Sequence, residues 1–130
     1  MANVPGNLKY TREHEWAKQE GDRVRVGITD YAQEQLGDVV FVELPKIGAK
    51  VAATKNFGVV ESVKAVSDLF APVSGEVVEV NGELPQKPET VNQDPYGKGW
   101  MIVVKPSNKE EWDQLLTAQQ YEEFLAQGGH

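Results

Sequence analysis

The chain has 130 residues, no cysteine, and a formal net charge of −7 from 13 Lys and Arg against 20 Asp and Glu. This length predicts one domain that can bury a core without disulfides. The acidic balance argues against nucleic acid and anionic membranes as partners, because both attract basic surfaces. It is compatible with docking onto proteins that have basic clefts. The absence of cysteine excludes a zinc–thiolate site and a cysteine nucleophile.

The start of the chain carries no recognisable targeting signal. Residues 1–7 lack the apolar stretch of a signal peptide and the arginine-rich composition of a transit peptide. Elsewhere the apolar runs are only a few residues long, too short to span a bilayer. We therefore expect a cytoplasmic protein. The two histidines, His14 and His130, lie near opposite ends of the chain, so the sequence offers no histidine cluster for a metal.

The first part of the chain predicts a β-hairpin. Residues 8–18 are broken and mostly polar, with Tyr10 and Trp16 as candidate core residues. A turn signal, Glu-Gly-Asp, follows at residues 20–22. Residues 23–28 then alternate apolar and polar side chains, which is the pattern of a half-buried strand that pairs with the preceding segment.

A short helix and two strands are predicted further along. Thr29 is a candidate N-cap for a helix over residues 31–36, and Gly37 stands where a helix-ending glycine belongs. Residues 39–44 and residues 100–104 are rich in valine and aromatic side chains, which favours strands. Three aromatic residues are predicted to lie in the core: Trp16, Phe41 and Trp100.

A short motif occurs twice. Residues 37–42 and residues 75–80 share the pattern glycine, acid, two valines, any residue, valine. A β fold with two similar halves would produce this repeat, and so would chance in a valine-rich chain. The glycine that opens each copy, and Gly27 after a predicted strand, are interpreted as positions of special backbone conformation.

The C-terminal segment, at about residues 107–127, predicts two short helices within a single domain that spans residues 1–130. Ser107 is followed three residues later by Glu110, and Thr117 by Gln120, and each pair has the spacing of a capping box. Apolar side chains then recur on one helical face in each segment.

Residues 57–71 leave two local structures open. Four valines favour strands, but fifteen residues exceed the usual strand length, so a turn would fall near residues 62–65 and place Lys64 at its tip. A helix is the alternative, because apolar residues also recur at helical spacing and Pro72 follows. Periodicity alone does not separate the two.

The same segment carries a family resemblance. Glu-Ser-Val-Lys-Ala at residues 61–65, Ser67-Asp68, and Ala-Pro-Val-Ser-Gly-Glu at residues 71–76 resemble the lipoylation region of the glycine cleavage system H-protein family. Further similar stretches lie in order along the chain: His14-Glu15-Trp16, Gly27-Ile28-Thr29-Asp30, Ala32-Gln33, Leu36-Gly37-Asp38, Phe41-Val42-Glu43-Leu44-Pro45, Val91-Asn92, Pro95-Tyr96 and Gly99-Trp100.

The resemblance implies a mainly β fold, the barrel-sandwich hybrid of lipoyl and biotinyl carriers, with short flanking helices and the lipoyl lysine at a hairpin tip. It also implies a carrier rather than an enzyme. In the family, lipoic acid is attached as an N6-lipoyl-lysine, and the arm carries an aminomethyl group from glycine decarboxylase to aminomethyltransferase. Dihydrolipoyl dehydrogenase reoxidises the arm, and a lipoate ligase or lipoyl transferase attaches it. We expect a monomer.

The resemblance assigns the attachment site to Lys64. Glu61 and Asp68 flank this lysine and are candidates for orienting an incoming enzyme or the loaded amine, with an ordinary solvated face as the alternative.

In the family the loaded arm folds back into a surface cleft. Glu15 is a candidate for pairing with the amine and His14 for lining the cleft, although a purely structural histidine fits equally well. Many members carry histidine in the short helix, where this chain has Tyr31 and Gln35.

Several rival functions fit less well. A serine hydrolase is disfavoured because His14 is the only internal histidine that could act as a base. Biotin carriers place their lysine between methionines, whereas Val63 and Ala65 flank Lys64. Lipoyl domains of 2-oxoacid dehydrogenases typically show Asp before the lysine. Two alternatives stay open: a lipoyl-relay donor to other lipoate-dependent complexes, and an unmodified interaction module.

Overall fold

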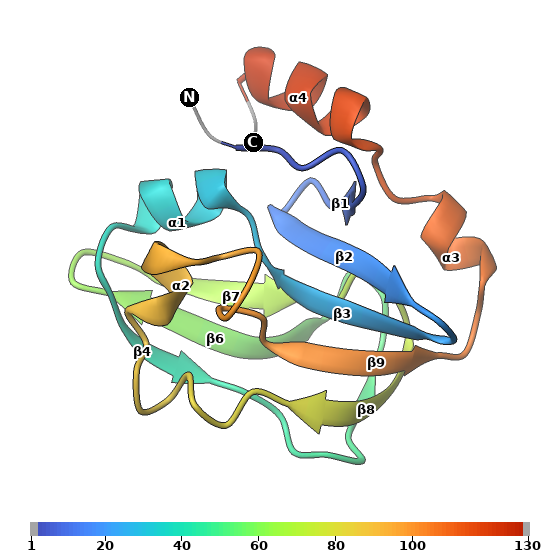
Figure 1. Ribbon diagram of the computed structural model, residues 1–130, viewed down its shortest axis with the longest axis horizontal. Helices are drawn as coiled ribbons and strands as arrows, with labels where there is room; N and C mark the ends of the chain where they lie inside the picture. The colour runs from blue at the N-terminus through green and yellow to red at the C-terminus, as the bar shows by residue number, and fades with distance from the viewer. Residues whose placement is uncertain (1–2, 129–130) are drawn as a thin grey trace.

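The computed structural model describes residues 3–128, so His130 lies outside the described residues (Figure 1). Within this range the chain forms two antiparallel sheets that face each other. The larger sheet has the order β1-β2-β3-β9-β8-β5, with bounds Lys9–Tyr10, Glu15–Glu20, Arg23–Ile28, Ile102–Pro106, Gly75–Val80 and Lys50–Val51. The smaller has the order β4-β6-β7, with bounds Val39–Glu43, Asn56–Ser62 and Val66–Phe70. The predicted mainly β fold is confirmed.

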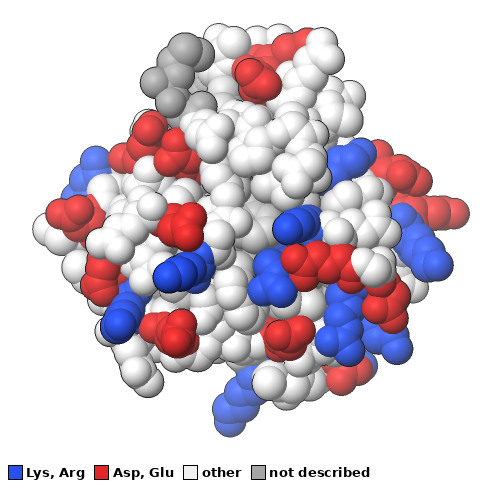
Figure 2. Space-filling model, in the orientation of Figure 1, with Lys and Arg blue, Asp and Glu red and all other residues white. Residues whose placement is uncertain are grey.

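In the described part of the chain, four short helices flank the sheets: α1 (Asp30–Leu36), α2 (Thr90–Gln93), α3 (Glu110–Asp113) and α4 (Ala118–Ala126). None of the helices within residues 3–128 is long and apolar enough to cross a membrane. Charged side chains of both signs are interspersed around the lower part of the face in Figure 2, whereas the part around α4 shows few of them.

The predicted hairpin forms from β2 and β3, and its register sets Trp16 opposite Gly27. Gly27 lies inside β3 rather than after it, so its expected role in an irregular backbone was wrong. A Cβ atom built on Gly27 would lie 2.7 Å from the indole ring of Trp16. The glycine is therefore required because the buried indole packs directly on the strand.

Helix α1 begins and ends as predicted. The Thr29 hydroxyl accepts a hydrogen bond from the Ala32 N–H, and Gly37 ends the helix with φ 78°. The Asn92 side chain then fixes the link to β4, because it donates to the Gly37 carbonyl (2.8 Å) and accepts from the Val39 N–H (2.9 Å). This link matters because it runs beside the β6–β7 turn.

Residues 57–71 form a hairpin, and the helical alternative was wrong. Strands β6 and β7 pair from Asn56–Phe70 to Glu61–Val66. Phe57 and Val60 of β6 are buried in the core, and their spacing of three residues reflects a register irregularity between Asn56 and Gly58. The pairing of this long antiparallel segment with β4 on its other edge stabilises the extended conformation.

The two copies of the repeated motif lie in different sheets, at the edge of the smaller one and inside the larger one. One copy opens β4 and the other forms β8, and both strands contain a β-bulge at the fourth residue of the motif, Val40 and Val78. The bulge explains why Phe41 is 45% exposed instead of lying in the core as predicted, because the extra residue turns Phe41 outward.

The core has two parts. The larger lies between the sheets and includes Val26, Val42, Val60 and Ile102. The smaller joins the N-terminal segment to α4 and contains Leu8, Tyr10, Trp16, Leu116 and Tyr121. Tyr10 and Trp16 are confirmed as core residues, whereas Trp100 is half-buried against the smaller part.

The two predicted capping boxes have different outcomes. The Thr117–Gln120 box is present at the start of α4, with reciprocal hydrogen bonds. The Ser107–Glu110 box was wrong, because α3 begins only at Glu110 and the Asn108 side chain accepts from the Glu110 N–H instead.

Candidate functional site

Lys64 lies at the tip of the β6–β7 hairpin and is exposed. The turn beneath it is closed by hydrogen bonds from the Ser62 N–H to the Ala65 carbonyl (2.8 Å) and from the Ala65 N–H to the Ser62 hydroxyl (3.1 Å). The Val63 N–H also donates to the Asp38 carbonyl (3.0 Å), which ties the tip to the α1–β4 link. The backbone that carries Lys64 is therefore fixed from two sides.

The lysine side chain passes close to Gly37. A Cβ atom built on Gly37 would lie 3.4 Å from the Lys64 Cε, which is an ordinary contact distance. Glycine is therefore favoured at this position by its positive φ and not by the lysine stem.

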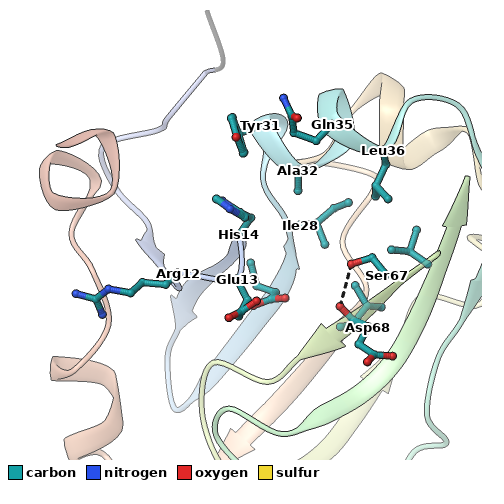
Figure 3. A pocket seen from close by; sticks show the side chains of 13 residues that line it. Arg12, Glu13, His14, Ile28, Tyr31, Ala32, Gln35, Leu36, Ser67 and Asp68 are labelled. Atoms are coloured by element: carbon teal, nitrogen blue, oxygen red, sulfur yellow. Dashed lines mark hydrogen bonds between the residues drawn. The ribbon is translucent and has the colours of Figure 1, made fainter. Parts of the chain in front are cut away.

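A cleft of about 390 Å³ opens between α1, the segment before β2, and β7 (Figure 3). Helix α1 contributes Tyr31, Gln35 and Leu36, and Figure 3 shows Arg12 extending away from the cleft. Much of its lining is apolar. The lining residues are Arg12, Glu13, His14, Glu15, Ile28, Tyr31, Ala32, Gln35, Leu36, Val60, Ser67, Asp68 and Leu69.

Glu15 is the buried carboxyl group of the cleft, with only 1% of its surface exposed. It accepts a hydrogen bond from the Thr11 hydroxyl (2.6 Å) and one from the Phe70 N–H (3.2 Å). Burial raises the pKa of Glu15 to about 8, because desolvation of the charged form outweighs these two hydrogen bonds. Near neutral pH this side chain is therefore mainly protonated.

His14 has a left-handed backbone conformation, with φ 73°. Its Nδ1 lies 2.8 Å from the Tyr121 hydroxyl, and its ring contacts the ring of Tyr31 at 4.7 Å between centroids. The Tyr121 hydroxyl also lies 2.8 Å from the Thr29 Oγ1, which caps α1. Helix α4 therefore holds two parts of the cleft wall together.

Comparison with known proteins identifies the family. A model of the Glycine cleavage H-protein family matches residues 8–128. This chain belongs to the glycine cleavage system H-protein family.

Relatives match over nearly their whole length. The chain is 61% identical over 126 residues to the glycine cleavage system H protein of Geobacillus kaustophilus. The matched region covers 97% of this chain and 99% of that protein. For the Bacillus subtilis H protein the identity is 57% over 122 residues, with 94% and 96% covered. The crystal structure of an H protein from Mycobacterium marinum matches with a TM-score of 0.85 and 47% identity, covering 98% of this chain and 100% of that chain.

Membership of the H-protein family confirms the resemblance seen in the sequence and the carrier function that it implied. The chain is a lipoyl carrier protein of the glycine cleavage system and not itself an enzyme.

The structure brings some of these residues together and separates others. His14, Glu15 and Asp68 all line the cleft, whereas Lys64 and Glu61 do not belong to its described lining. Strand register sets Glu61 opposite Val66, and Asp68 opposite Val59. Since side chains alternate along a strand, Asp68 is on the face of β7 opposite to Ser67.

Two residues that hold cleft-lining side chains in place were missed by sequence reasoning. Thr11 binds the buried carboxyl of Glu15, and Tyr121 binds His14 from 107 residues away in the chain. Neither carries a local signal, because a threonine before a strand and a tyrosine on an amphipathic helix are both explained by ordinary packing. Only the tertiary fold shows these contacts.

Proposed function

We propose that Lys64 is the attachment site and that it carries lipoic acid as an N6-lipoyl-lysine. The observation that carries this assignment is the exposed position of Lys64 on a hairpin tip whose backbone is held by hydrogen bonds. Lysine suits this role because its amine can be acylated and its stem is long and flexible. The whole chain, residues 1–130, acts as one carrier domain.

The cleft fits such an arm. Its apolar residues, among them Ile28, Leu36 and Leu69, would exclude water from a folded-back arm. Lipoate held on Lys64 would supply a dithiolane whose S–S bond opens when it accepts an aminomethyl group. Glu15 would pair with an amine that enters the cleft, because a positive charge beside the buried carboxyl favours its ionised form. His14, the neighbour of Glu15 in the chain, lines the same cleft.

The partners follow from the same function. Glycine decarboxylase loads the arm, aminomethyltransferase unloads it, dihydrolipoyl dehydrogenase reoxidises it, and a lipoate ligase or lipoyl transferase attaches it. The net charge of −7 supports association with partners that present basic surfaces.

Intact mass spectrometry tests the assignment. The chain is incubated with lipoate, ATP and a lipoate ligase, and the modified peptide is mapped. We expect one lipoyl group on Lys64, none in Lys64→Arg, and normal modification in Lys46→Arg, which changes another exposed lysine.

Lys64→Arg should also fold normally and abolish aminomethyl carriage in a reconstituted glycine exchange assay. Retained carriage in that variant would contradict the proposal.

A further inference from the structure

Large apolar side chains are exposed around Lys64. Among the described residues, five such side chains are exposed, and all but Ile47 belong to the neighbourhood of the hairpin tip. We call these four the tip patch: Val40, Phe41, Val63 and Val66. Their exposed fractions range from 45% for Phe41 to 76% for Val63.

Strand register explains how the tip patch forms. Phe41 of β4, Glu61 of β6 and Val66 of β7 lie directly opposite one another, so their side chains share the outer face of the small sheet. The bulge in β4 adds Val40 beside Phe41. Val63 follows β6 in the turn, and its N–H donates to the carbonyl of Asp38, the residue before β4. The grouping therefore comes from three strands and the turn together.

Acidic side chains outnumber basic ones around the tip patch. Across β4, β6, β7 and the turn between β6 and β7, Lys64 is the only cation, and the acids are Glu43, Glu61 and Asp68. Acylation of Lys64 removes even that positive charge. A partner that covers this surface must therefore be apolar at its centre and basic at its rim.

We propose that the tip patch is the docking surface for the enzyme that attaches lipoate to Lys64. This inference rests on the proposed attachment at Lys64. The lysine amine attacks the carbonyl carbon of an activated acyl donor, a mixed anhydride with a phosphate. The amide C–N bond forms, the C–O bond breaks with its electron pair leaving on the phosphate, and the amine proton passes to solvent.

The position of the reacting atom favours this partner over the others. The Lys64 Nζ stands at the end of a side chain that starts in the turn itself. An enzyme that delivers an acyl group to this atom must therefore cover Val63 and the neighbouring strands. Enzymes that act at the far end of an attached arm reach their reacting atoms without such close contact. Exposed apolar groups that become buried in a contact of this kind commonly supply much of its affinity.

Lipoylation kinetics test the docking surface. The double variant Phe41→Thr/Val66→Thr places β-branched residues at both strand positions and makes two of the four tip-patch side chains polar. Against a purified lipoate ligase with lipoate and ATP, we expect kcat/KM to fall roughly tenfold or more, mainly through KM. The matched control is Ile47→Thr, which changes an equally exposed side chain away from the tip and should leave kcat/KM unchanged.

Two further measurements separate docking from folding and from amine access. Circular dichroism melts should be unchanged, and acetic anhydride should acetylate Lys64 equally fast in all variants.

Val63→Ser provides a second variant that leaves the strands untouched, and it should also raise KM. Glu43→Gln should raise KM less at high salt than at low salt, because ions screen the attraction.

Each outcome has a distinct meaning. If the unchanged chain is not lipoylated at Lys64, the proposed function itself fails. If it is lipoylated and the double variant behaves like Ile47→Thr, the docking surface is wrong while the carrier function stands. Normal lipoylation of the double variant with slow aminomethyl transfer would assign the tip patch to an arm-using enzyme and overturn this proposal.

Discussion

A carboxyl group buried as deeply as that of Glu15 is uncommon in a protein interior. Two hydrogen bonds satisfy it, yet desolvation still raises its pKa to about 8, compared with an ordinary value of 4.5. The folded chain therefore binds a proton at Glu15 that the unfolded chain releases at lower pH.

This difference predicts a pH dependence of stability. Between pH 4.5 and about 8 the unfolded state has lost the Glu15 proton and the folded state has kept it, so stability falls as pH rises. A single proton corresponds to a slope of about 1.4 kcal/mol per pH unit. We expect Glu15→Gln to flatten the pH dependence of the free energy of unfolding, measured by urea titration at several pH values. An unchanged slope in the variant would show that another group titrates.

Single residues also show where sequence reasoning has its limits. Glu15, His14 and Asp68 were predicted as candidates through family resemblance, and the fold places all three at one cleft. The burial of Glu15 was not predictable, because its partners Thr11 and Phe70 lie on different segments. The roles of these residues toward an arm stay predictions.

Among the elements, α4 links the C-terminal segment to the cleft. Tyr121 stacks on Tyr10 with 4.6 Å between ring centroids, and its hydroxyl meets both His14 and the Thr29 cap of α1. The hydroxyl therefore connects three elements, whereas the ring belongs to the smaller core.

Removing that hydroxyl should loosen α1. We expect Tyr121→Phe to lower the free energy of unfolding by about 1 kcal/mol and to accelerate hydrogen exchange at the Ala32 N–H, which the Thr29 hydroxyl binds. The control is Tyr10→Phe, which removes the other hydroxyl of the same ring stack and breaks only the bond to the Pro5 carbonyl. Equal exchange at Ala32 in both variants would argue against a specific link from α4 to α1.

Local signals predicted the elements with strong caps or alternation, such as β3, α1 and α4. They did not resolve residues 57–71, where strand and helix periodicities overlap, and the pairing with β4 decided in favour of strands. They also missed the exposure of Phe41, because a bulge shifts the alternation by one residue and depends on the partner strand. The two copies of the internal repeat share a bulge at the same position but lie in sheets of six and three strands, so the repeat does not correspond to two matching halves.

At the scale of the whole molecule, acylation of Lys64 is detectable as a change in net charge. The net charge is −7, and acylation of Lys64 removes one positive charge. We expect the lipoylated chain to elute later than the unmodified chain from an anion-exchange column at neutral pH. Lys64→Arg treated in the same way should not shift. A shift in this variant would mean that another lysine had been acylated.

The fixed turn beneath Lys64 has a consequence for any arm attached there. Hydrogen bonds within the turn and to Asp38 leave the lysine side chain and the arm as the flexible part, with an anchor that does not move relative to the cleft. Entry of the arm into the cleft is then an intramolecular event, at an effective concentration of roughly millimolar for a short flexible tether. An enzyme that withdraws the arm competes with this local concentration, so release depends on affinity for the partner as well as on the cleft.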